Sequence, residues 1–350
     1  MTNKVDILIP TKDRACQLHL LLSQISKNLK GIGRITITIQ SSSDDFEKGY
    51  SILKQRVARD NTFRNLRKNA EIIYHKRDSL AGIIDSLKYL GESKYILPLT
   101  DDEIFHKKYD LENAPASQYF FNNPSVLACA IRLGKNITHK LPESHRKALY
   151  VNGQPTFHNG EENIMIWSWP DNLHTYHWAC VASGTGHIYR KDAYLEWFHK
   201  FGQDNFLNIE GEGVKYLSRK LFGLPQLFDK VLDIADLIQM RFLNKVFGIY
   251  EQDVLRCVFY KFLYHIPILY REGIPFIMVS PLESVTTSLD INTTQEWRPV
   301  YSNPFASNII LNQKYLKGEI ISTDFINTSI LDEPAIRDPR KISPFNYIRY

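Results

Sequence analysis

The first forty residues carry two different hydrophobic periods. Residues 5–9 are apolar except at Asp6, which predicts a buried strand. Apolar side chains then recur at helical spacing over residues 15–29, and a helix is expected there. Isoleucines alternate with threonines over residues 35–39, which is typical of a second strand. The chain therefore opens with a strand, a helix and a strand.

The alternation continues through the next sixty residues. The pattern predicts helices over 47–60 and 81–90 and strands over 71–74 and 95–99. Strands that alternate with helices at this spacing form a mostly parallel sheet with right-handed crossovers. The expected fold class is α/β, with a Rossmann-type, mostly parallel sheet flanked by helices.

The second half of the chain is less regular. The pattern predicts a helix over 191–201, a helix-rich insertion over about 213–247, a helix over 254–263 and a strand over 276–279. We expect one domain over 1–285, followed by a C-terminal extension over 286–350. Within the domain, we expect a first half over about 1–130 and a second half over about 131–285.

Three polar segments, residues 10–14, 40–45 and 100–103, each follow a predicted strand. In sheets of this kind, ligands bind at the carboxyl ends of the strands. The third segment contains three adjacent carboxylates, Asp101, Asp102 and Glu103, which repel one another unless a cation compensates them. Mg²⁺ and Mn²⁺ prefer such oxygen ligands and are commonly shared with substrate phosphates. A divalent metal beside a phosphate-bearing ligand is therefore expected.

Composition and charge limit the classes of partner and the cellular location that we expect. The formal net charge is +5, and no run of five or six like charges occurs, so nucleic acid is not expected as a partner. The four cysteines lie far apart without a CxxC pair, as in reduced proteins. The first residues lack the order of a signal peptide, and no stretch of 18 uncharged apolar residues occurs. A cytoplasmic location is predicted, with peripheral contact to an anionic membrane left open.

Two segments carry a resemblance to a known family. The opening sequence VDILIPTKDR, residues 5–14, and the sequence DDEIF, residues 101–105, resemble family 2 glycosyltransferases of the GT-A-like kind. The likeness covers residues 4–130 well and 180–285 loosely. It implies a nucleotide-binding half over about 1–130 and an acceptor half over about 131–285. It implies metal-dependent, inverting transfer of a monosaccharide from a nucleoside diphosphate sugar to a hydroxyl of a glycan or lipid-linked acceptor.

The resemblance assigns roles to the polar segments. It implies that the nucleotide pocket is lined by Pro10, Thr11, Asp13 and Arg14. The family's acidic motif is usually DxD, whereas this chain has Thr100 before three carboxylates. Asp102 is expected to bind the metal, Glu103 to be a second ligand, and Asp101 to lie near the ribose.

The second predicted strand departs from the family. There the strand often ends in an Asp that reads the nucleotide base, whereas here Gln40 stands at that place and Ser42 follows it. Because an amide both donates and accepts hydrogen bonds, Gln40 keeps the capacity to read a base.

An inverting transferase also needs a carboxylate base for the acceptor hydroxyl. By resemblance it lies at the start of a late helix. Asp253, with Glu251 beside it, precedes the helix predicted over 254–263, and Glu212 is the rival because it lies closer to the segment 183–190. We take Asp253 first. Capping of the helix N-terminus also explains Glu251 and Asp253.

Two other functions compete. A nucleotidyltransferase uses a similar sheet and carboxylate-held Mg²⁺, but it usually needs a glycine-rich loop after the first strand, and PTKDR has no glycine. The second competing function is that of a non-catalytic relative that binds glycans or nucleotide sugars. Thr100 and Gln40, which stand where acidic residues are common, favour that alternative.

Overall fold

A computed structural model of the chain describes part of the sequence, and every structural statement below concerns that part. The described residues are 3–77, 82–136, 157–158, 163–169, 178, 183–201, 277–289, 308–321, 335–336 and 347–349. Both the predicted insertion over 213–247 and the predicted helix over 254–263 lie outside them.

The described residues build a nine-stranded sheet in the order β4-β3-β1-β5-β11-β8-β12-β10-β9. Its strands are β1 (Val5–Lys12), β3 (Ile32–Gln40), β4 (Glu71–Lys76), β5 (Tyr95–Pro98), β8 (Val126–Ala130), β9 (Phe157–His158), β10 (Ile164–Ser168), β11 (His187–Arg190) and β12 (Ile277–Pro281). Seven of the nine strands run in one direction, and only β11 and β10 oppose them. The predicted α/β fold with a mostly parallel sheet is confirmed.

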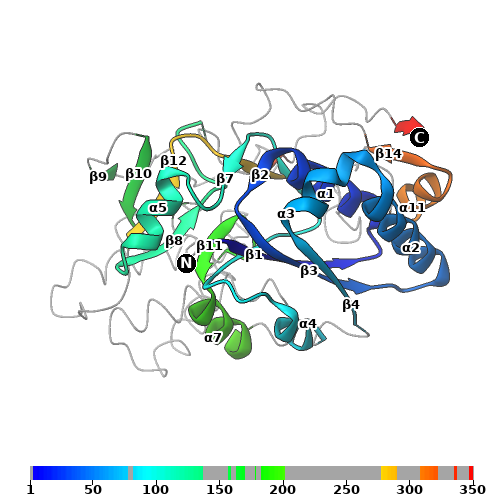
Figure 1. The fold of residues 1–350 in the computed structure, drawn as a ribbon, viewed down its shortest axis with the longest axis horizontal. Helices are drawn as coiled ribbons and strands as arrows, with labels where there is room; N and C mark the ends of the chain where they lie inside the picture. Colours follow the sequence, from blue (N-terminus) through cyan, green and yellow to red (C-terminus); the bar gives the residue numbers. More distant parts are fainter. Residues whose placement is uncertain are drawn as a thin grey trace, which may run out of the picture.

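Helices cover both faces of this sheet. Figure 1 shows α1, α2 and α3 on one side of β1, β3 and β4, and α4 and α7 on the other. The helices are α1 (Ala15–Asn28), α2 (Asp44–Arg59), α3 (Arg64–Asn69), α4 (Gly82–Ser86), α5 (Pro115–Asn122), α7 (Lys191–Phe201) and α11 (Asn308–Leu316), with 3₁₀ turns at Asn61–Phe63 and Leu87–Tyr89. Because helices lie on both sides, the first five residues of β1 are all buried, including the polar Asp6.

Three short sheets complete the described architecture. The strand β6 (Glu103–Phe105) pairs with β13 (Thr286–Leu289), which also pairs with β15 (Ala335–Ile336). The other two sheets join β14 (Glu319–Ile321) to β16 (Tyr347–Arg349), and β2 (Leu29–Lys30) to β7 (Tyr109–Asp110). Asp101, Asp102 and Glu103 form what we call the acidic segment, which leads directly into β6. Residues after 285 thus add strands beside this segment.

Most predicted elements of the first half are present, some with longer boundaries, such as β1 and β3, and some with shorter ones, such as β5 and α4. The structure has α1 where the helix over 15–29 was expected. The prediction that a polar turn begins at residue 10 is wrong, because β1 continues to Lys12. Pro10 and Thr11 pair there with Thr38 and Ile39 of β3. The polar side chains after residue 9 are therefore held on a strand of the sheet.

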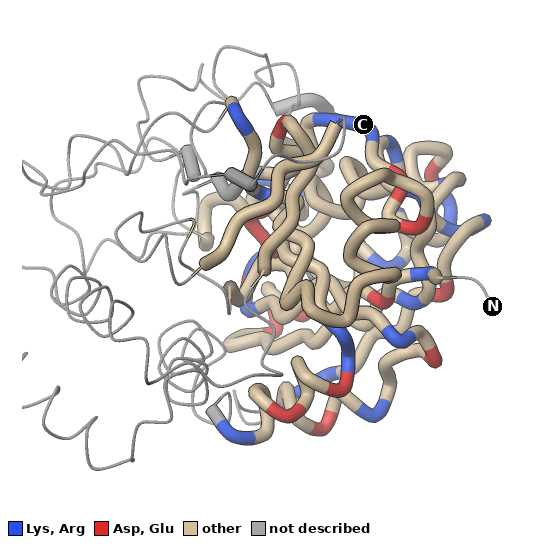
Figure 2. The backbone as a smooth tube through the Cα atoms, turned by 90° about the vertical axis from the view of Figure 1, so that its left-hand side faces the viewer, with Lys and Arg blue, Asp and Glu red and all other residues tan. Residues whose placement is uncertain are grey.

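Charged residues of both signs occur throughout the described part of the chain. Figure 2 shows basic and acidic residues interspersed along the described backbone. Within the described ranges, no helix combines the length and the apolar character that crossing a membrane requires.

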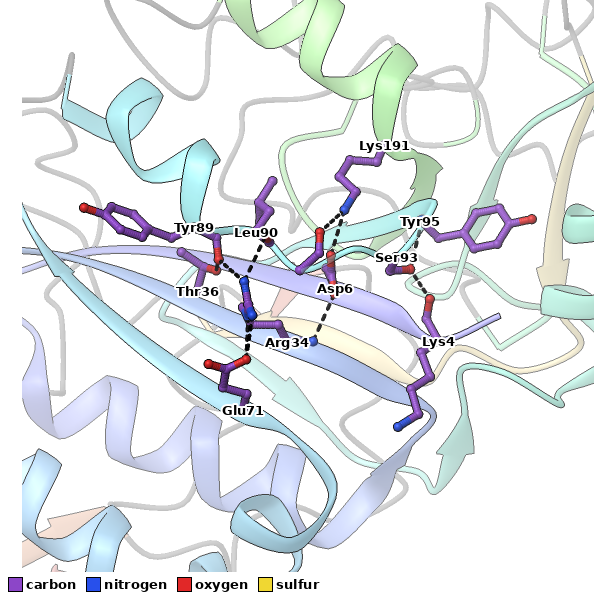
Figure 3. Close-up of polar contacts among 11 residues, drawn as sticks. Lys4, Asp6, Arg34, Thr36, Glu71, Tyr89, Leu90, Ser93, Tyr95 and Lys191 are labelled. Atoms are coloured by element: carbon purple, nitrogen blue, oxygen red, sulfur yellow. Dashed lines mark hydrogen bonds and ion pairs between the residues drawn. The ribbon is translucent and has the colours of Figure 1, made fainter. Parts of the chain in front are cut away.

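Asp6 forms a buried ion pair at the amino ends of the strands. Its carboxylate lies 2.9 Å from Lys191 Nζ at the start of α7 and accepts a hydrogen bond from the Arg34 backbone N–H (Figure 3). A Cβ on Gly33 or Gly91 would lie 2.5 or 2.6 Å from Asp6 Oδ1, so both positions must lack a side chain. A cavity of about 540 Å³, lined in part by Lys4 and Lys94, opens at this edge.

Lys191→Met is expected to lower the free energy of unfolding by about 3 kcal/mol, because it leaves the Asp6 carboxylate buried without its cation. Urea denaturation measures the loss. Lys48→Met is the matched control, since Lys48 pairs with Asp45 at the surface and should matter little. Equal stability of the two variants would contradict a buried pair that joins β1 to α7.

The buried His19 links α1 to α11. Its Nδ1 lies 3.1 Å from the Tyr315 hydroxyl, and its ring packs edge-on against Phe63. Burial, assisted by the positive charge of Arg56, lowers the pKa of His19 from 6.5 to about 3. The folded protein therefore holds this imidazole neutral at pH values where the unfolded chain protonates it.

This difference predicts a loss of stability in acid. Because the folded-state pKa lies below the unfolded one, stability contributed by His19 is complete above pH 6.5 and falls as the pH drops toward 3. The stability lost between pH 7 and pH 5 is about 2 kcal/mol. Urea denaturation at pH 7 and pH 5 should show a smaller difference for His19→Gln than for the unsubstituted protein, and identical differences would refute the assignment.

Candidate functional site

The carboxyl ends of β1, β3 and β5 lie together at one edge of the sheet. Thr11 and Lys12 of β1 pair with Ile39 and Gln40 of β3, and the backbone of β5 continues beside β1 through Leu99 N, which donates to Leu8 O. The acidic segment then begins within reach of β1. Its first carboxylate, Asp101 Oδ2, accepts a hydrogen bond of 2.7 Å from Thr11 Oγ1. The expected meeting of the two polar segments is confirmed.

Four side chains close into a connected group, which we call the Thr11 network: Thr11, Arg14, Tyr50 and Asp101. Thr11 Oγ1 lies 2.9 Å from the Tyr50 hydroxyl, and the Arg14 backbone N–H donates to that hydroxyl at 3.0 Å. The Arg14 guanidinium donates a hydrogen bond to Asp101 Oδ1 at 3.1 Å, which is also an ion pair. Both oxygens of Asp101 therefore accept hydrogen bonds from the protein itself.

Burial and charge act in opposite directions on this group. Burial raises the pKa of Asp101, and the Arg14 guanidinium opposes that rise. Burial lowers the pKa of Arg14, but Asp101 and then Asp102 outweigh burial and raise it above its ordinary value. Arg14 is therefore a fixed cation between two carboxylates, with its side chain still 26% exposed. It offers positive charge to an anionic ligand at this edge.

The turn between β1 and α1 has a strained backbone. Asp13 has a φ of 59°, in the left-handed region that L side chains other than Asn and Asp rarely adopt. Its backbone N–H donates to Gln40 O at 3.1 Å, and its Oδ1 accepts from the Ser42 N–H at 2.7 Å. Asp13, Gln40 and Ser42, predicted separately from the sequence, thus form one hydrogen-bonded turn. Both hydrogen bonds join Asp13 to backbone groups, the Gln40 carbonyl and the Ser42 N–H.

Asp102 differs from its two acidic neighbours. Its Oδ1 is buried and has no hydrogen-bond partner within the described part of the chain. A buried carboxylate oxygen in that state is costly unless a ligand satisfies it. Asp102 therefore fits the role of a metal ligand.

Glu103 is held by the protein on both oxygens. Its Oε1 accepts from Thr185 Oγ1 at 2.8 Å, and its Oε2 from Thr286 Oγ1 at 2.5 Å. Arg132 Nη1 lies 4.0 Å from Oε1. This arrangement ties the acidic segment to β13 and to the loop before β11. It favours Asp102 over Glu103 as the carboxylate that meets a metal.

The described residues contain no group of three or more His, Cys, Asp or Glu side chains that would hold a metal without help. A site that Mg²⁺ shares with phosphates needs only one or two carboxylates from the protein. The residues at this edge therefore fit a metal that arrives together with a diphosphate, and they do not fit a resident metal cage.

Several residues that lie at or near this edge were not predicted as site residues from the sequence. Arg77 follows β4, donates its backbone N–H to Ile39 O at 2.8 Å, and is 5% exposed. Burial lowers the pKa of Arg77, while Tyr50 and Asp101 act to raise it, which places its charge near the acidic segment. Tyr50 belongs to the apolar stripe of α2, and Thr286 lies 183 residues from its partner Glu103. Only the position of Arg77, directly after a strand, was a usable signal.

The predicted base residues cannot be placed. Asp253, Glu251 and Glu212 all lie outside the described residues. Pro10 is placed on β1, half-buried, one residue before Thr11. The described edge thus brings together the predicted nucleotide and metal residues, and the base stays a prediction.

Comparison with known proteins gives structural likeness only. No family model matches the chain, and no curated protein matches it. Among solved structures, it is similar to Staphylococcus aureus TarS 1–349, at 13% identity and a TM-score of 0.31, over 56% of this chain and 48% of that one. It is also similar to the mannosyltransferase PcManGT from Pyrobaculum calidifontis in complex with GDP-Man and Mn²⁺, at 14% identity and a TM-score of 0.25, over 39% and 37%.

A third similar structure is HddC from Yersinia pseudotuberculosis, at 14% identity and a TM-score of 0.24, over 36% of this chain and 57% of that one. The chain thus aligns with about half or less of TarS and PcManGT. These likenesses concern the fold alone and do not assign the chain to a family. At these scores they carry no argument about activity.

Proposed function

We propose that this chain is a glycosyltransferase that moves a monosaccharide from a nucleoside diphosphate sugar to a hydroxyl of a glycan or lipid-linked acceptor. One observation supports it most. At the carboxyl edge of the sheet, the guanidinium of Arg14 lies at an acidic segment in which Asp102 Oδ1 is buried and has no partner among the described residues. A cation and a metal-binding carboxylate at one edge suit a diphosphate.

Donor binding uses the residues of this edge. Arg14 pairs with the diphosphate, and the turn formed by Asp13, Gln40 and Ser42 lies where the nucleoside would extend. Asp101 keeps Arg14 in place, and it is the proposed neighbour of the ribose. Pro10 and Thr11 form the wall of the pocket on β1.

Asp102 would hold the divalent metal, Mn²⁺ or Mg²⁺. The family resemblance implies Glu103 as a second ligand. When bound, such an ion neutralises the negative charge that develops on the departing diphosphate. The chain's own cation, Arg14, acts on the same charge from the side of Asp101.

Acceptor activation requires a carboxylate that removes the hydroxyl proton. We assign it to Asp253, with Glu251 beside it and Glu212 as the competitor. Attack from the face opposite the diphosphate inverts the anomeric carbon, which is the outcome implied by the family resemblance. A lipid-linked acceptor would bring the protein to an anionic membrane surface.

The function is tested by a donor panel. UDP, GDP and TDP, each with Mn²⁺, should raise the melting temperature for at least one nucleotide, and the corresponding sugar donors should release the diphosphate when an acceptor is present. Stabilisation without release or transfer would instead support a non-catalytic binding protein. Release of pyrophosphate from a nucleoside triphosphate and a sugar phosphate would identify a nucleotidyltransferase. Absence of any stabilisation would contradict a nucleotide site.

A further inference from the structure

We propose that Tyr50 of α2 is a positioning residue for the donor site, and that its hydroxyl holds the turn that presents Arg14. This inference rests on the proposed function, since it concerns the same edge of the sheet. It concerns a residue that contacts the predicted pocket residues and is itself hidden from a ligand, with 1% of its surface exposed.

The directions of the hydrogen bonds in the Thr11 network follow from the donors available. The Arg14 backbone N–H can only donate, so the Tyr50 oxygen accepts from it. Thr11 donates its single proton to Asp101 Oδ2. The Tyr50 hydroxyl must therefore donate to Thr11 Oγ1 at 2.9 Å. A directed chain runs from the Arg14 backbone through Tyr50 and Thr11 to Asp101.

This chain holds Arg14 at two points. Its backbone is fixed by the Tyr50 hydroxyl, and its guanidinium is fixed by Asp101, which Tyr50 reaches through Thr11. The residue before it, Asp13, has a left-handed backbone that persists only where surrounding contacts determine it. Loss of the Tyr50 hydroxyl removes one contact next to that strained residue. The guanidinium would then be presented to a diphosphate less often in the right place.

A purely structural role for Tyr50 makes a different prediction. The ring lies in the apolar stripe of α2 with Leu53 and Val57, and Phe at position 50 would keep that packing. If packing were the whole role, Tyr50→Phe would change nothing at the donor site. Tyr74→Phe is the matched control. The Tyr74 hydroxyl is buried without a hydrogen-bond partner in the described ranges, and its ring lies 5.3 Å from Lys54 Nζ of the same helix α2.

The test is isothermal titration of Mn²⁺ with UDP, with GDP and with TDP into the unsubstituted protein, Tyr50→Phe and Tyr74→Phe, with urea denaturation of each. We expect Tyr50→Phe to weaken nucleotide diphosphate binding about tenfold, the loss typical of one buried hydrogen bond, and Tyr74→Phe to leave it unchanged. In the transfer reaction, Tyr50→Phe should raise the donor KM and also lower kcat, because Arg14 acts on the departing diphosphate, whereas Tyr74→Phe should change neither.

Equal affinity of Tyr50→Phe and the unsubstituted protein would overturn the inference while leaving the proposed function intact. Failure of the unsubstituted protein to bind any of UDP, GDP and TDP in the presence of Mn²⁺ would refute both. Should Tyr50→Phe not fold, Thr11→Val breaks the same chain at its next link, and undiminished nucleotide affinity in that variant would equally refute the inference.

Discussion

Asp102→Asn lowers the rate of sugar transfer about a thousandfold and abolishes the Mn²⁺-dependent part of nucleotide binding; this is the largest effect that we expect. The reason is the buried Asp102 Oδ1, which has no hydrogen-bond partner among the described residues. An amide keeps the shape of the side chain and removes the charge that a divalent cation needs. Losing charge stabilisation of a leaving group typically costs about 100- to 1,000-fold or more in rate.

Two comparisons make the Asp102 result specific. Asp45→Asn alters an exposed carboxylate that pairs only with Lys48 at the surface, and it should leave transfer and Mn²⁺ dependence intact. Glu103→Gln keeps the shape of a carboxylate whose oxygens accept from Thr185 and Thr286, so its main effect should be on stability. Full transfer activity in Asp102→Asn, measured by diphosphate release, would remove the metal assignment.

The second large effect concerns the base. Asp253→Asn is expected to lower kcat about 100-fold or more, within the 10²- to 10⁴-fold range typical of general base catalysis, while nucleotide diphosphate affinity stays near that of the unsubstituted protein. Binding is spared because the base acts on the acceptor hydroxyl and not on the donor. Titration with UDP or GDP and steady-state rates measure the two properties separately.

Glu212→Gln and Glu251→Gln complete the comparison, since all three carboxylates were candidates from the sequence. A large loss of kcat in Glu212→Gln, with full activity in Asp253→Asn, would move the base to Glu212. Loss of unfolding free energy in Asp253→Ala, with full kcat in Asp253→Asn, would show helix capping instead of catalysis, because Asn caps a helix about as well as Asp.

The N-terminal half was predictable because its elements repeat a clear period. The stripe over 15–29 became α1, and the isoleucine alternation over 35–39 became part of β3. The buried pair of Asp6 with Lys191 was not predicted, because the two residues are 185 positions apart. A parallel sheet then brings the carboxyl ends of its strands to one edge, which is why Thr11 and the acidic segment met as expected.

Other features of the edge depend on contacts that no local pattern encodes. Tyr50 reads as one more apolar position of α2, and only the tertiary structure shows its hydroxyl against the Arg14 backbone. From the sequence, Glu103 was expected to be a metal ligand. In the structure, Thr286, far along the chain, donates a hydrogen bond to one of its carboxylate oxygens. The extent of β1 was also underestimated, because Pro10 was read as a strand end although β1 continues through Thr11 to Lys12.

The most direct measurement is a crystal structure with Mn²⁺ and a non-hydrolysable analogue of whichever sugar nucleotide binds. We expect the anomalous signal of the metal beside Asp102 Oδ1, the diphosphate against the Arg14 guanidinium, and the nucleoside toward the turn at Asp13. Binding of the nucleotide at the opposite edge, in the cavity lined by Lys4, Asp6 and Lys94, would contradict the site and with it the proposed chemistry.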